Sequence, residues 1–341
     1  MSSPFVIVGA GAIGGIVGTH LIRSGHDVVF VEANAAHADA IREHGLKLSG
    51  SLDAVVRAPV YAPGTYDGPV ERLLLAVKSR DTVEALTPFA EALAPDGYVL
   101  SLQNGLEEYK IANLVGASRT LGAYLTFGGY YTGPGHIVYG GTGSFKIGEL
   151  DGSRGPRIEA LQAALSAQQK VDITDNIFGY LWSKMALGAV YFGTAVVDAP
   201  VLEIYDDPRA RAVLAILAGE TVGVADASGV RTENCDGFDP KAFRLDAPLN
   251  TSAQDASWEA QRVYWKSHDN QYTGVWRDLK IHRRKTEVDW QIGRVIQAAE
   301  TVGRSVPHLR RLKSVVESIE AGHCAQSWDA LYSIAEVEKA S

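Results

Sequence analysis

The sequence predicts an α/β fold, with an N-terminal domain built on a parallel sheet that has an antiparallel extension, and an all-helical C-terminal domain. Over the first half of the chain, short apolar runs alternate with amphipathic stretches, as in repeated βα units. A glycine-rich loop directly follows the first apolar run, and helix-like spacing replaces strand signals in the second half. Because 341 residues exceed the size of most single cores, we place two domains at 1–175 and 176–341.

The N-terminal domain is expected to contain parallel strands joined by helices. The apolar runs predict strands at 5–8, 28–31, 73–77, 98–102 and 120–125, and the stretches between them predict helices at 13–24, 35–44, 82–92 and from Leu106 onward. Further along the chain, apolar and polar residues alternate between glycines, which predicts strands at 136–139 and 144–147. We interpret these two strands as an antiparallel addition to the sheet. A helix at 154–167 and a strand at 171–174 complete the domain.

The C-terminal domain is expected to be helical. Its apolar spacing predicts helices at 177–197, 207–228, 255–266, 275–303 and 309–322. Residues 231–251, which contain Pro, Asp and Asn, are expected to form a loop.

Composition excludes several classes of partner. A formal net charge of −8 argues against a nucleic-acid or anionic-membrane partner. No run is apolar for the about 18 residues that a membrane span requires, and the N-terminus lacks the basic flank of a signal peptide. Cys235 and Cys324 have the spacing of neither a metal site nor a disulfide framework. We therefore expect a soluble, cytoplasmic protein without a metal.

The first apolar run ends in a loop with the G-x-G-x-x-G spacing of Rossmann-type dinucleotide-binding domains, Gly9-Ala10-Gly11-Ala12-Ile13-Gly14. Gly9 permits the turn off the strand, Gly11 lets the backbone approach a pyrophosphate, and Gly14 allows close packing of helix on sheet. The pyrophosphate would meet N–H groups at the positive end of the next helix. The loop lies between a strand and a helix, as the motif requires, so a bound dinucleotide is favoured over a purely structural turn.

Glu32 ends the second predicted strand, where an acidic side chain can accept hydrogen bonds from the adenosine ribose hydroxyls. It would repel a 2′-phosphate, and the stretch from Ala33 to Ala36 has no Arg or Lys to neutralise one. The sequence therefore favours NAD(H), with NADP(H) second. The alternative is that Glu32 is only a solvated strand end.

Polar residues follow two further predicted strands, at the edge where parallel sheets bind ligands. Asn104 can donate and accept hydrogen bonds to substrate or nicotinamide, or it can cap the helix that begins at Leu106. Lys78 can support the cofactor or the substrate, although an exposed surface lysine is the commoner outcome.

Two ionisable residues of the helical domain are also candidates. Lys184 lies in an otherwise apolar helix, where burial would lower its pKa and suit it to proton exchange near neutrality. Glu287 lies in the charged run 283–290, where it could hold a substrate hydroxyl or belong to a solvated helix face.

Together these segments resemble the ketopantoate reductase (2-dehydropantoate 2-reductase) family over nearly the whole chain. The resemblance is carried by the glycine loop and four further segments, Ser101-Leu102-Gln103-Asn104-Gly105, the hairpin from Gly133 to Glu149, Trp182-Ser183-Lys184, and Lys285-Thr286-Glu287-Val288-Asp289. It implies hydride transfer between nicotinamide and a 2-keto acid, in a cleft between two domains. By position it implies Lys184 as the general acid, Glu287 as the carboxylate that binds the substrate hydroxyl, and Asn104 as the orienting amide. It also implies a homodimer.

The sequence departs from the family pattern near the substrate. Gly188 and either Tyr191 or Phe192 replace the two asparagines that usually follow the lysine, and the arginine that usually serves NADPH near positions 33–34 is absent. Because hydrogen-bonding groups are lost, ketopantoate itself is disfavoured as substrate. We expect a paralogue that acts on a larger or more apolar 2-keto or hydroxy acid.

Three further residues are assigned to the substrate site. Thr273 stands where the family usually has serine, and Arg277 and Arg284 are candidate carboxylate clamps, because a guanidinium can make paired bonds to a carboxylate. Two other functions share the architecture. A non-catalytic dinucleotide sensor is favoured by the lost asparagines but disfavoured by the retained Lys184 and Glu287, and a related opine or hydroxy acid dehydrogenase would need different site residues.

Overall fold

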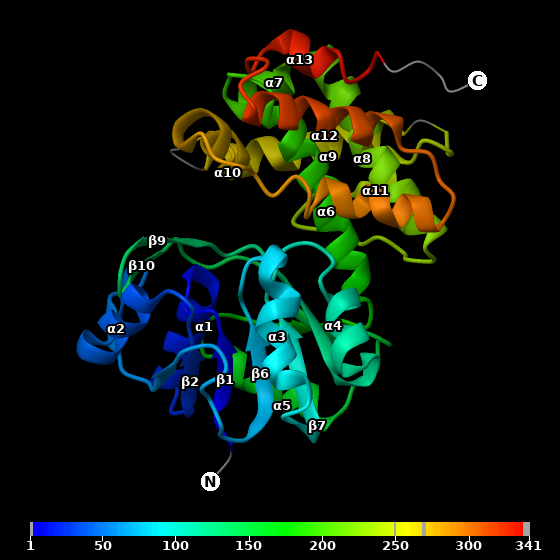
Figure 1. Ribbon diagram of the computed structural model, residues 1–341. Helices are drawn as coiled ribbons and strands as arrows, with labels where there is room; N and C mark the ends of the chain where they lie inside the picture. The colour runs from blue at the N-terminus through cyan, green and yellow to red at the C-terminus, as the bar shows by residue number, and fades with distance from the viewer. Residues whose placement is uncertain (1–2, 249, 268–270, 337–341) are drawn as a thin grey trace. The chain divides into compact units, whose positions relative to one another are not determined.

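A computed structural model of the chain describes residues 3–248, 250–267 and 271–336 (Figure 1). The chain divides into two compact units, Met1–Ile177 and Phe178–Ser341. The first unit holds the sheets and the second is helical, so the predicted fold class is confirmed. None of the helices among the described residues is long and apolar enough to cross a membrane.

The main sheet of the first unit has the strand order β12-β11-β8-β7-β6-β1-β2-β5. Its strands are β1 (Phe5–Val8), β2 (Val28–Val31), β5 (Val60–Tyr61), β6 (Val70–Leu75), β7 (Leu93–Ser101), β8 (Thr120–Leu125), β11 (Phe145–Glu149) and β12 (Asp172–Ile173). The six neighbouring strands β8, β7, β6, β1, β2 and β5 run parallel to one another, and β11 pairs antiparallel with β8. The chain order reverses between β1 and β6, and ligands of open α/β sheets bind at such a switch point.

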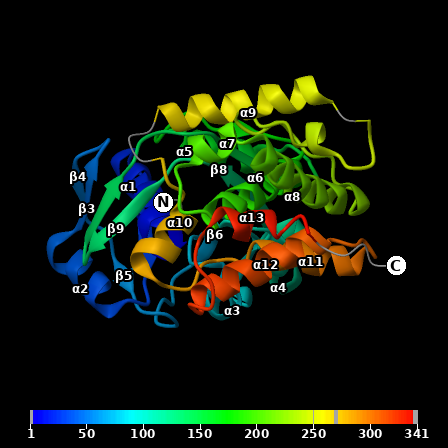
Figure 2. The same cartoon turned by 90° about the horizontal axis from the view of Figure 1, so that it is seen from above.

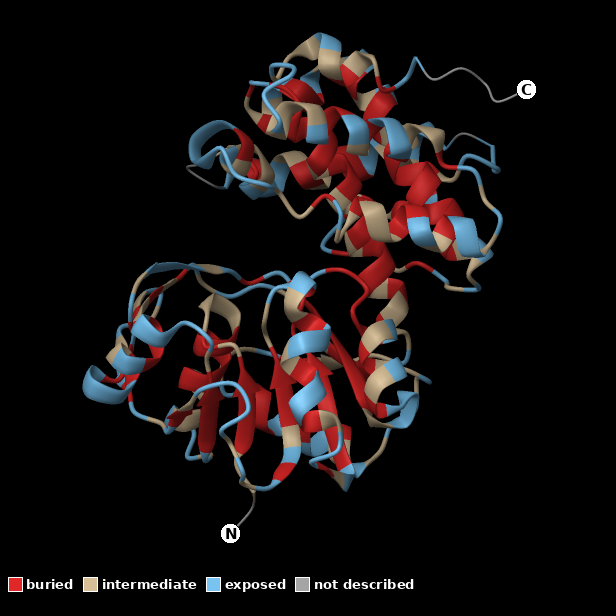
Figure 3. Ribbon diagram, viewed as in Figure 1, coloured by how far each residue is buried: buried red, intermediate tan, exposed pale blue. Residues whose placement is uncertain are grey.

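Helices cover both faces of this sheet because its strands alternate apolar side chains between the faces. Phe5 and Ile7 of β1 pack into one core with α1 (Ala12–Arg23), α2 (Ala35–His44) and α5 (Pro156–Leu165). Val6 and Val8 pack into the other core, with α3 (Thr82–Ala90) and α4 (Glu108–Val115). Figure 3 shows the strands between these layers as almost entirely buried.

A second, four-stranded sheet has the order β4-β3-β10-β9. Its strands are β3 (Leu46–Gly50), β4 (Ala54–Val56), β9 (Gly129–Gly133) and β10 (His136–Tyr139). The prediction that 136–139 extends the main sheet is therefore wrong, and only β11 does so. The alternation that predicts a strand does not identify the partner with which the strand pairs.

Helix α1 packs against both sheets, and Figure 2 shows it beside β3, β4 and β9 of the small sheet. A Cβ at Gly18 would come within 2.5 Å of Phe30 on the main sheet. A Cβ at Gly15 would come within 2.3 Å of Ile137 on the small sheet. Glycines on two sides of α1 therefore bring both sheets against the helix that follows the glycine loop.

The second unit is a bundle of helices, the longest of which are α6 (Ile177–Ala195) and α8 (Pro208–Ala227). The others are α7 (Val201–Asp206), α9 (Thr251–Lys266), α10 (Gly274–Arg277), α11 (Ile292–Thr301), α12 (Pro307–Glu320) and α13 (Trp328–Tyr332). In the loop predicted at 231–251, the described residues 231–248 and 250 are non-helical apart from a 3-10 turn at Pro240–Phe243, residue 249 lies outside the described residues, and Thr251 already begins α9. Phe243 stacks on Phe238 at 5.0 Å and meets Trp258 edge-on at 5.1 Å, which holds this loop against α9.

The single helix predicted at 275–303 is wrong. Helix α10 continues into a π-helical turn at Asp278–His282, and the chain then leaves helical geometry at Arg283, whose φ is 47°. Helix α11 does not begin until Ile292. The charged run has helix-like spacing, but its side chains bond to α12 rather than along a helix of their own.

Candidate functional site

The glycine loop is held open at the switch point between β1 and β6. The Gly9 N–H donates to the Val31 carbonyl at 2.8 Å, and Gly9 has a φ of 95°, a left-handed conformation that favours glycine. A Cβ at Gly14 would lie 2.0 Å from the Gly9 carbonyl oxygen, so a side chain there would break the turn. A Cβ at Gly11 would meet no described atom within 4 Å. The loop therefore leaves space beside Gly11 at the start of α1, which fits a pyrophosphate.

Glu32 is fixed by the backbone on both sides. Its Oε2 accepts a hydrogen bond from the Ala10 N–H and its Oε1 accepts one from the Asn34 N–H, each at 2.8 Å. The residue is half-buried. Glu32 is thus tied to the glycine loop and to the turn before α2, unlike a solvated strand end, and this anchored carboxylate beside the open loop fits the ribose of a dinucleotide.

His37, which the sequence analysis missed, supports the same loop from beneath. It is 2% exposed, and its Nδ1 accepts a hydrogen bond from the Gly135 N–H at 2.8 Å. Because Nδ1 is an acceptor, the neutral ring carries its proton on Nε2, which donates to the Ala10 carbonyl at 2.9 Å. The backbone of Ala10 is therefore hydrogen-bonded on both sides, its N–H to Glu32 and its carbonyl to His37. The sequence signals this role only by a histidine in the first turn of the helix predicted at 35–44.

Lys78 and Asn104 lie on adjacent turns after β6 and β7, and both are exposed. The turns are joined because the Ser79 hydroxyl donates to the Asn104 carbonyl at 2.9 Å. Helix α4 begins at Glu108, two residues later than predicted, with Glu107 at its cap position. Asn104 is therefore not the helix cap, and its side chain stays a candidate for ligand contact.

A buried polar network lies under these two turns. The Gln103 Nε2 donates to the Val77 carbonyl at 3.0 Å and to the Thr82 hydroxyl at 2.9 Å. The Thr82 hydroxyl in turn donates to Glu107 Oε2 at 2.7 Å, and Lys110 pairs with the same oxygen at 2.6 Å. Gln103 and Glu107 are 5% and 0% exposed, so the network fixes the backbone from which Lys78 and Asn104 project.

Lys184 lies in the middle of α6, half-buried between buried neighbours. The preceding Ser183 is fully buried, and its hydroxyl donates to the Gly179 carbonyl at 2.6 Å. The same hydroxyl accepts the Glu233 N–H at 2.9 Å. Ser183 therefore fastens the loop after α8 to α6, beside the candidate lysine.

Glu287 lies in the non-helical segment before α11 and is half-buried. Its carbonyl accepts the N–H groups of Trp290 and Gln291, each at 3.0 Å. On one side of it, the Thr286 hydroxyl donates to Glu320 at 2.6 Å, and on the other, Asp289 pairs with Lys313 at 2.8 Å. The segment around Glu287 is therefore not a solvated helix face, the alternative that the sequence left open, and Glu287 lies in a turn bonded to α12 at two points.

The three residues assigned to the substrate site differ in their surroundings. Thr273 is 5% exposed, and its hydroxyl caps α10 by accepting the Trp276 N–H at 3.1 Å. Arg277 is exposed, one turn along the same helix. Arg284 already pairs with a carboxylate, because its Nε and Nη2 lie 2.9 and 2.7 Å from Asp278 Oδ1. Of the two predicted clamps, Arg277 is thus the better placed to bind a substrate carboxylate.

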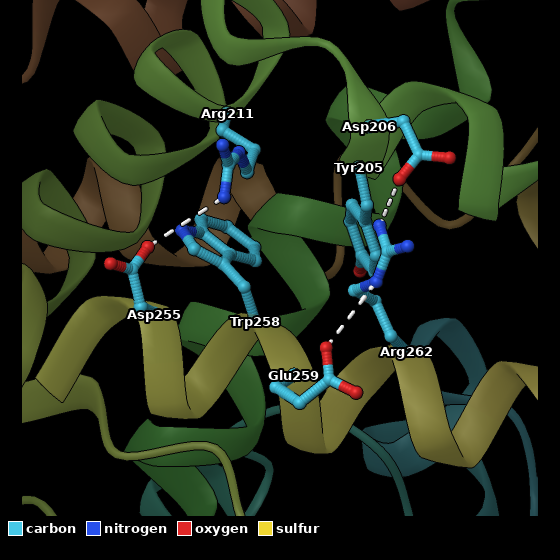
Figure 4. Close-up of a pocket in the computed structure, with 7 residues that line it drawn as sticks. All are labelled: Tyr205, Asp206, Arg211, Asp255, Trp258, Glu259 and Arg262. Atoms are coloured by element: carbon cyan, nitrogen blue, oxygen red, sulfur yellow. Dashed lines mark hydrogen bonds and ion pairs between the residues drawn. The ribbon is translucent and has the colours of Figure 1, made fainter. Parts of the chain in front are cut away.

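A pocket of about 420 Å³ lies elsewhere on the helical unit and contains none of the predicted site residues. It is lined by Tyr205, Asp206, Arg211, Asp255, Trp258, Glu259 and Arg262. Figure 4 shows Arg262 paired with Asp206 and Glu259, and Arg211 paired with Asp255 at 3.6 Å. Each of its five charged side chains is in an ion pair with another residue of the pocket, so we do not assign it to the reaction.

Comparisons with known proteins agree with this architecture. Residues 5–152 match the family described as ketopantoate reductase PanE/ApbA, and residues 176–320 match its C-terminal domain. A 2-dehydropantoate 2-reductase of Pyrococcus horikoshii is 28% identical over 320 residues, which cover 92% of this chain and 97% of that protein.

Solved structures give the same result. The crystal structure of a PanE/ApbA family ketopantoate reductase from Ralstonia eutropha JMP134 superposes with a TM-score of 0.76 at 27% identity, covering 93% of this chain and 99% of that one. D-mandelate dehydrogenase in complex with NADH and anilino(oxo)acetate has a TM-score of 0.77 at 21% identity, covering 93% and 98%. At that identity the likeness shows the fold alone.

The family matches span both units, so the chain belongs to the ketopantoate reductase family. It is accordingly an oxidoreductase that uses a nicotinamide dinucleotide and acts on CH–OH groups. The resemblance inferred from the glycine loop and the four further segments is confirmed.

Proposed function

We propose that this chain interconverts a 2-keto acid and the corresponding 2-hydroxy acid with NAD(H), using Lys184 as general acid and base. The observation that carries the proposal is the anchored Glu32 carboxylate, which lies beside an open glycine loop at the switch point of the sheet. A bound nicotinamide supplies or accepts the hydride.

The protein's own residues would bind the acid and manage charge and protons. In reduction, the Lys184 ammonium stabilises the negative charge that develops on the carbonyl oxygen and donates a proton to it. In oxidation, the neutral amine accepts that proton. Arg277 pairs with the substrate carboxylate, Asn104 orients the carbonyl, and Glu287 accepts a hydrogen bond from a substrate hydroxyl.

NAD(H) is proposed over NADP(H) on charge. Glu32 is anchored beside the glycine loop, and in Rossmann-type domains an acidic residue after the second strand binds the ribose hydroxyl that carries the phosphate in NADP(H). Asn34 and the two alanines that follow it are exposed and uncharged. A phosphate there would meet a fixed negative charge without a cation in the turn from Ala33 to Ala36.

A spectrophotometric screen at the 340 nm absorbance of reduced nicotinamide tests the proposal, with hydroxy acids plus NAD⁺ and keto acids plus NADH. Lys184→Ala should lower kcat by about 10²–10⁴-fold, the usual effect of lost acid–base catalysis. The matched control is Lys170→Ala, because that lysine is 85% exposed and its ion pair is with Asp172, on the surface of the first unit. An unchanged kcat in Lys184→Ala would remove this lysine from the mechanism.

A non-catalytic dinucleotide sensor is the second candidate, favoured by Gly188 and either Tyr191 or Phe192 at the positions of the family's asparagines. It predicts tight NADH binding with no turnover of any acid in the screen. The homodimer is likewise a proposal, which light scattering on the purified chain measures directly.

A further inference from the structure

One face of α6 carries the candidate catalytic lysine. Between residues 180 and 192 the half-buried positions are Tyr180, Lys184, Leu187, Gly188 and Tyr191, and the other positions are buried. The spacing i, i+4, i+7, i+8, i+11 places these five residues on one stripe of the helix. We call this stripe the Lys184 face.

Gly188 leaves room on the Lys184 face, one helical turn after the lysine. Among the described residues, a Cβ at Gly188 would have one heavy atom within 4 Å, the side-chain oxygen of Gln291 at 3.2 Å, a close contact that the flexible glutamine side chain can relieve. The Gln291 N–H donates to the carbonyl of Glu287 at 3.0 Å. The space beside Gly188 is therefore bounded by the same segment that carries the candidate carboxylate.

Tyr191, on the next turn of the face, is held rigidly. Its hydroxyl donates to Gln261 Oε1 at 2.8 Å, and Gln261 is 2% exposed. Its ring meets Trp265 edge-on, with centroids 5.6 Å apart and planes at 82°. Burial raises the pKa of the phenol well above its ordinary value, so it stays a neutral donor. Its single proton is committed to Gln261, which leaves the aromatic ring as the surface offered to a ligand.

We propose that Gly188 and Tyr191, the latter positioned by Gln261, select the side chain of the substrate, and that they select a flat, apolar group such as an aryl ring. This inference rests on the proposed function, because it assumes that the reacting carbonyl lies at Lys184. The gap at Gly188 accommodates the added volume, and the fixed Tyr191 ring makes an edge-on or offset contact with an aryl group. A substrate hydroxyl at this place would lose the hydrogen-bonding partners that asparagines provide.

Binding of two unreactive 2-keto acid mimics tests the proposal. Oxamate has no side chain, and anilino(oxo)acetate is the same core with a phenyl group. Calorimetric titration of the NADH-loaded protein should give a Kd for anilino(oxo)acetate at least 10-fold below that for oxamate. Gly188→Leu, which fills the gap, should abolish or reverse this ratio, and so should Tyr191→Asn. Tyr191→Phe, which keeps the ring, should preserve most of the preference.

The control is Val263→Ala, on the exposed side of α9, where the side chain is 59% exposed. It should leave the ratio unchanged. Equal Kd values for the two mimics in the wild-type protein, together with turnover of 2-keto acids, would refute the aryl preference while leaving the proposed reaction intact. If neither mimic binds and no 2-keto acid is turned over, the proposed reaction itself is refuted. A ratio that survives Gly188→Leu in folded protein would show that the aryl group lies elsewhere.

Discussion

Replacing Glu32 by Gln should change the coenzyme preference of this enzyme. The substitution keeps the shape of the side chain and removes its charge. In the native protein both carboxylate oxygens accept backbone N–H groups, from Ala10 and from Asn34. A glutamine can accept from only one of them through its oxygen and turns an NH₂ group toward the other. The variant therefore weakens the anchoring of the loop as well as the acceptor for the ribose.

The size of the effect follows from two contributions. A carboxylate about 5 Å from a unit charge contributes about 1 kcal/mol in water and about 3 kcal/mol at an effective dielectric constant of about 20, and this repulsion of the 2′-phosphate of NADPH is lost. NADH loses hydrogen bonds to a charged acceptor, at about 1.5–3 kcal/mol. The lower limits add to about 2.5 kcal/mol, so the ratio of Kd(NADPH) to Kd(NADH) should fall by at least about 60-fold.

Fluorescence titration of both reduced coenzymes, at one fixed ionic strength, measures this ratio. The ionic strength must be held constant because salt screens the repulsion. Glu43→Gln is the matched control, because that glutamate lies on the exposed side of α2 and its nearest charged partner is His44. The reasoning fails if the wild-type protein binds NADPH as tightly as NADH, or if Glu32→Gln leaves the ratio within about 3-fold of the wild-type value.

Three further predictions concern other parts of the chain. His37→Phe keeps an aromatic ring beside Tyr131 but removes both hydrogen bonds of the imidazole, so it should destabilise the protein by about 1–3 kcal/mol and raise the Kd for NADH. His37→Gln should cause a smaller loss of stability and a smaller rise in Kd, and chemical denaturation with a parallel NADH titration compares the two variants. Glu220, which is 5% exposed, accepts the N–H groups of His308 and Leu309 at the start of α12. Glu220→Ala should therefore lower the free energy of unfolding by about 2–4 kcal/mol and lower Tm, whereas an unchanged Tm would contradict this capping role. Burial raises the pKa of Tyr205 far above the ordinary tyrosine value of about 10. The unfolded chain therefore loses this proton first, and the associated stability, complete below about pH 10, should fall as the pH rises further. Tyr205→Phe should flatten the alkaline decline in denaturation free energy, and an unaltered slope would argue against this assignment.

Local features of the sequence were sufficient for much of the first unit. The bounds of β1, β2 and β8 are those predicted, because a buried parallel strand is a short apolar run between glycines and polar turns. The glycine loop could also be predicted from the sequence, because the turn at Gly9 and the close contact at Gly14 require glycine at those positions. The family resemblance added Lys184, Glu287 and Asn104 as candidates by position alone.

The errors occurred where pairing or side-chain partners decide the structure. Strand β10 was recognised but joined to the wrong sheet, because alternation is the same in either. The helix predicted at 275–303 ends early, because Thr286 and Asp289 bond to α12. Period and charge spacing describe one segment at a time, so they contain no information about what that segment contacts.

The sequence by itself determined that the chain has a dinucleotide loop, an acidic residue after the second strand and a lysine in an apolar helix. Only the tertiary structure decided which hydrogen bonds fix the loop and the acidic residue in place. Ala10 bonds to Glu32 and His37, which are 22 and 27 residues away along the chain, and His37 bonds to Gly135, 98 residues away. Glu32 therefore has a fixed position rather than a solvated one, because hydrogen bonds between distant residues form only when the sheets bring them within about 3 Å.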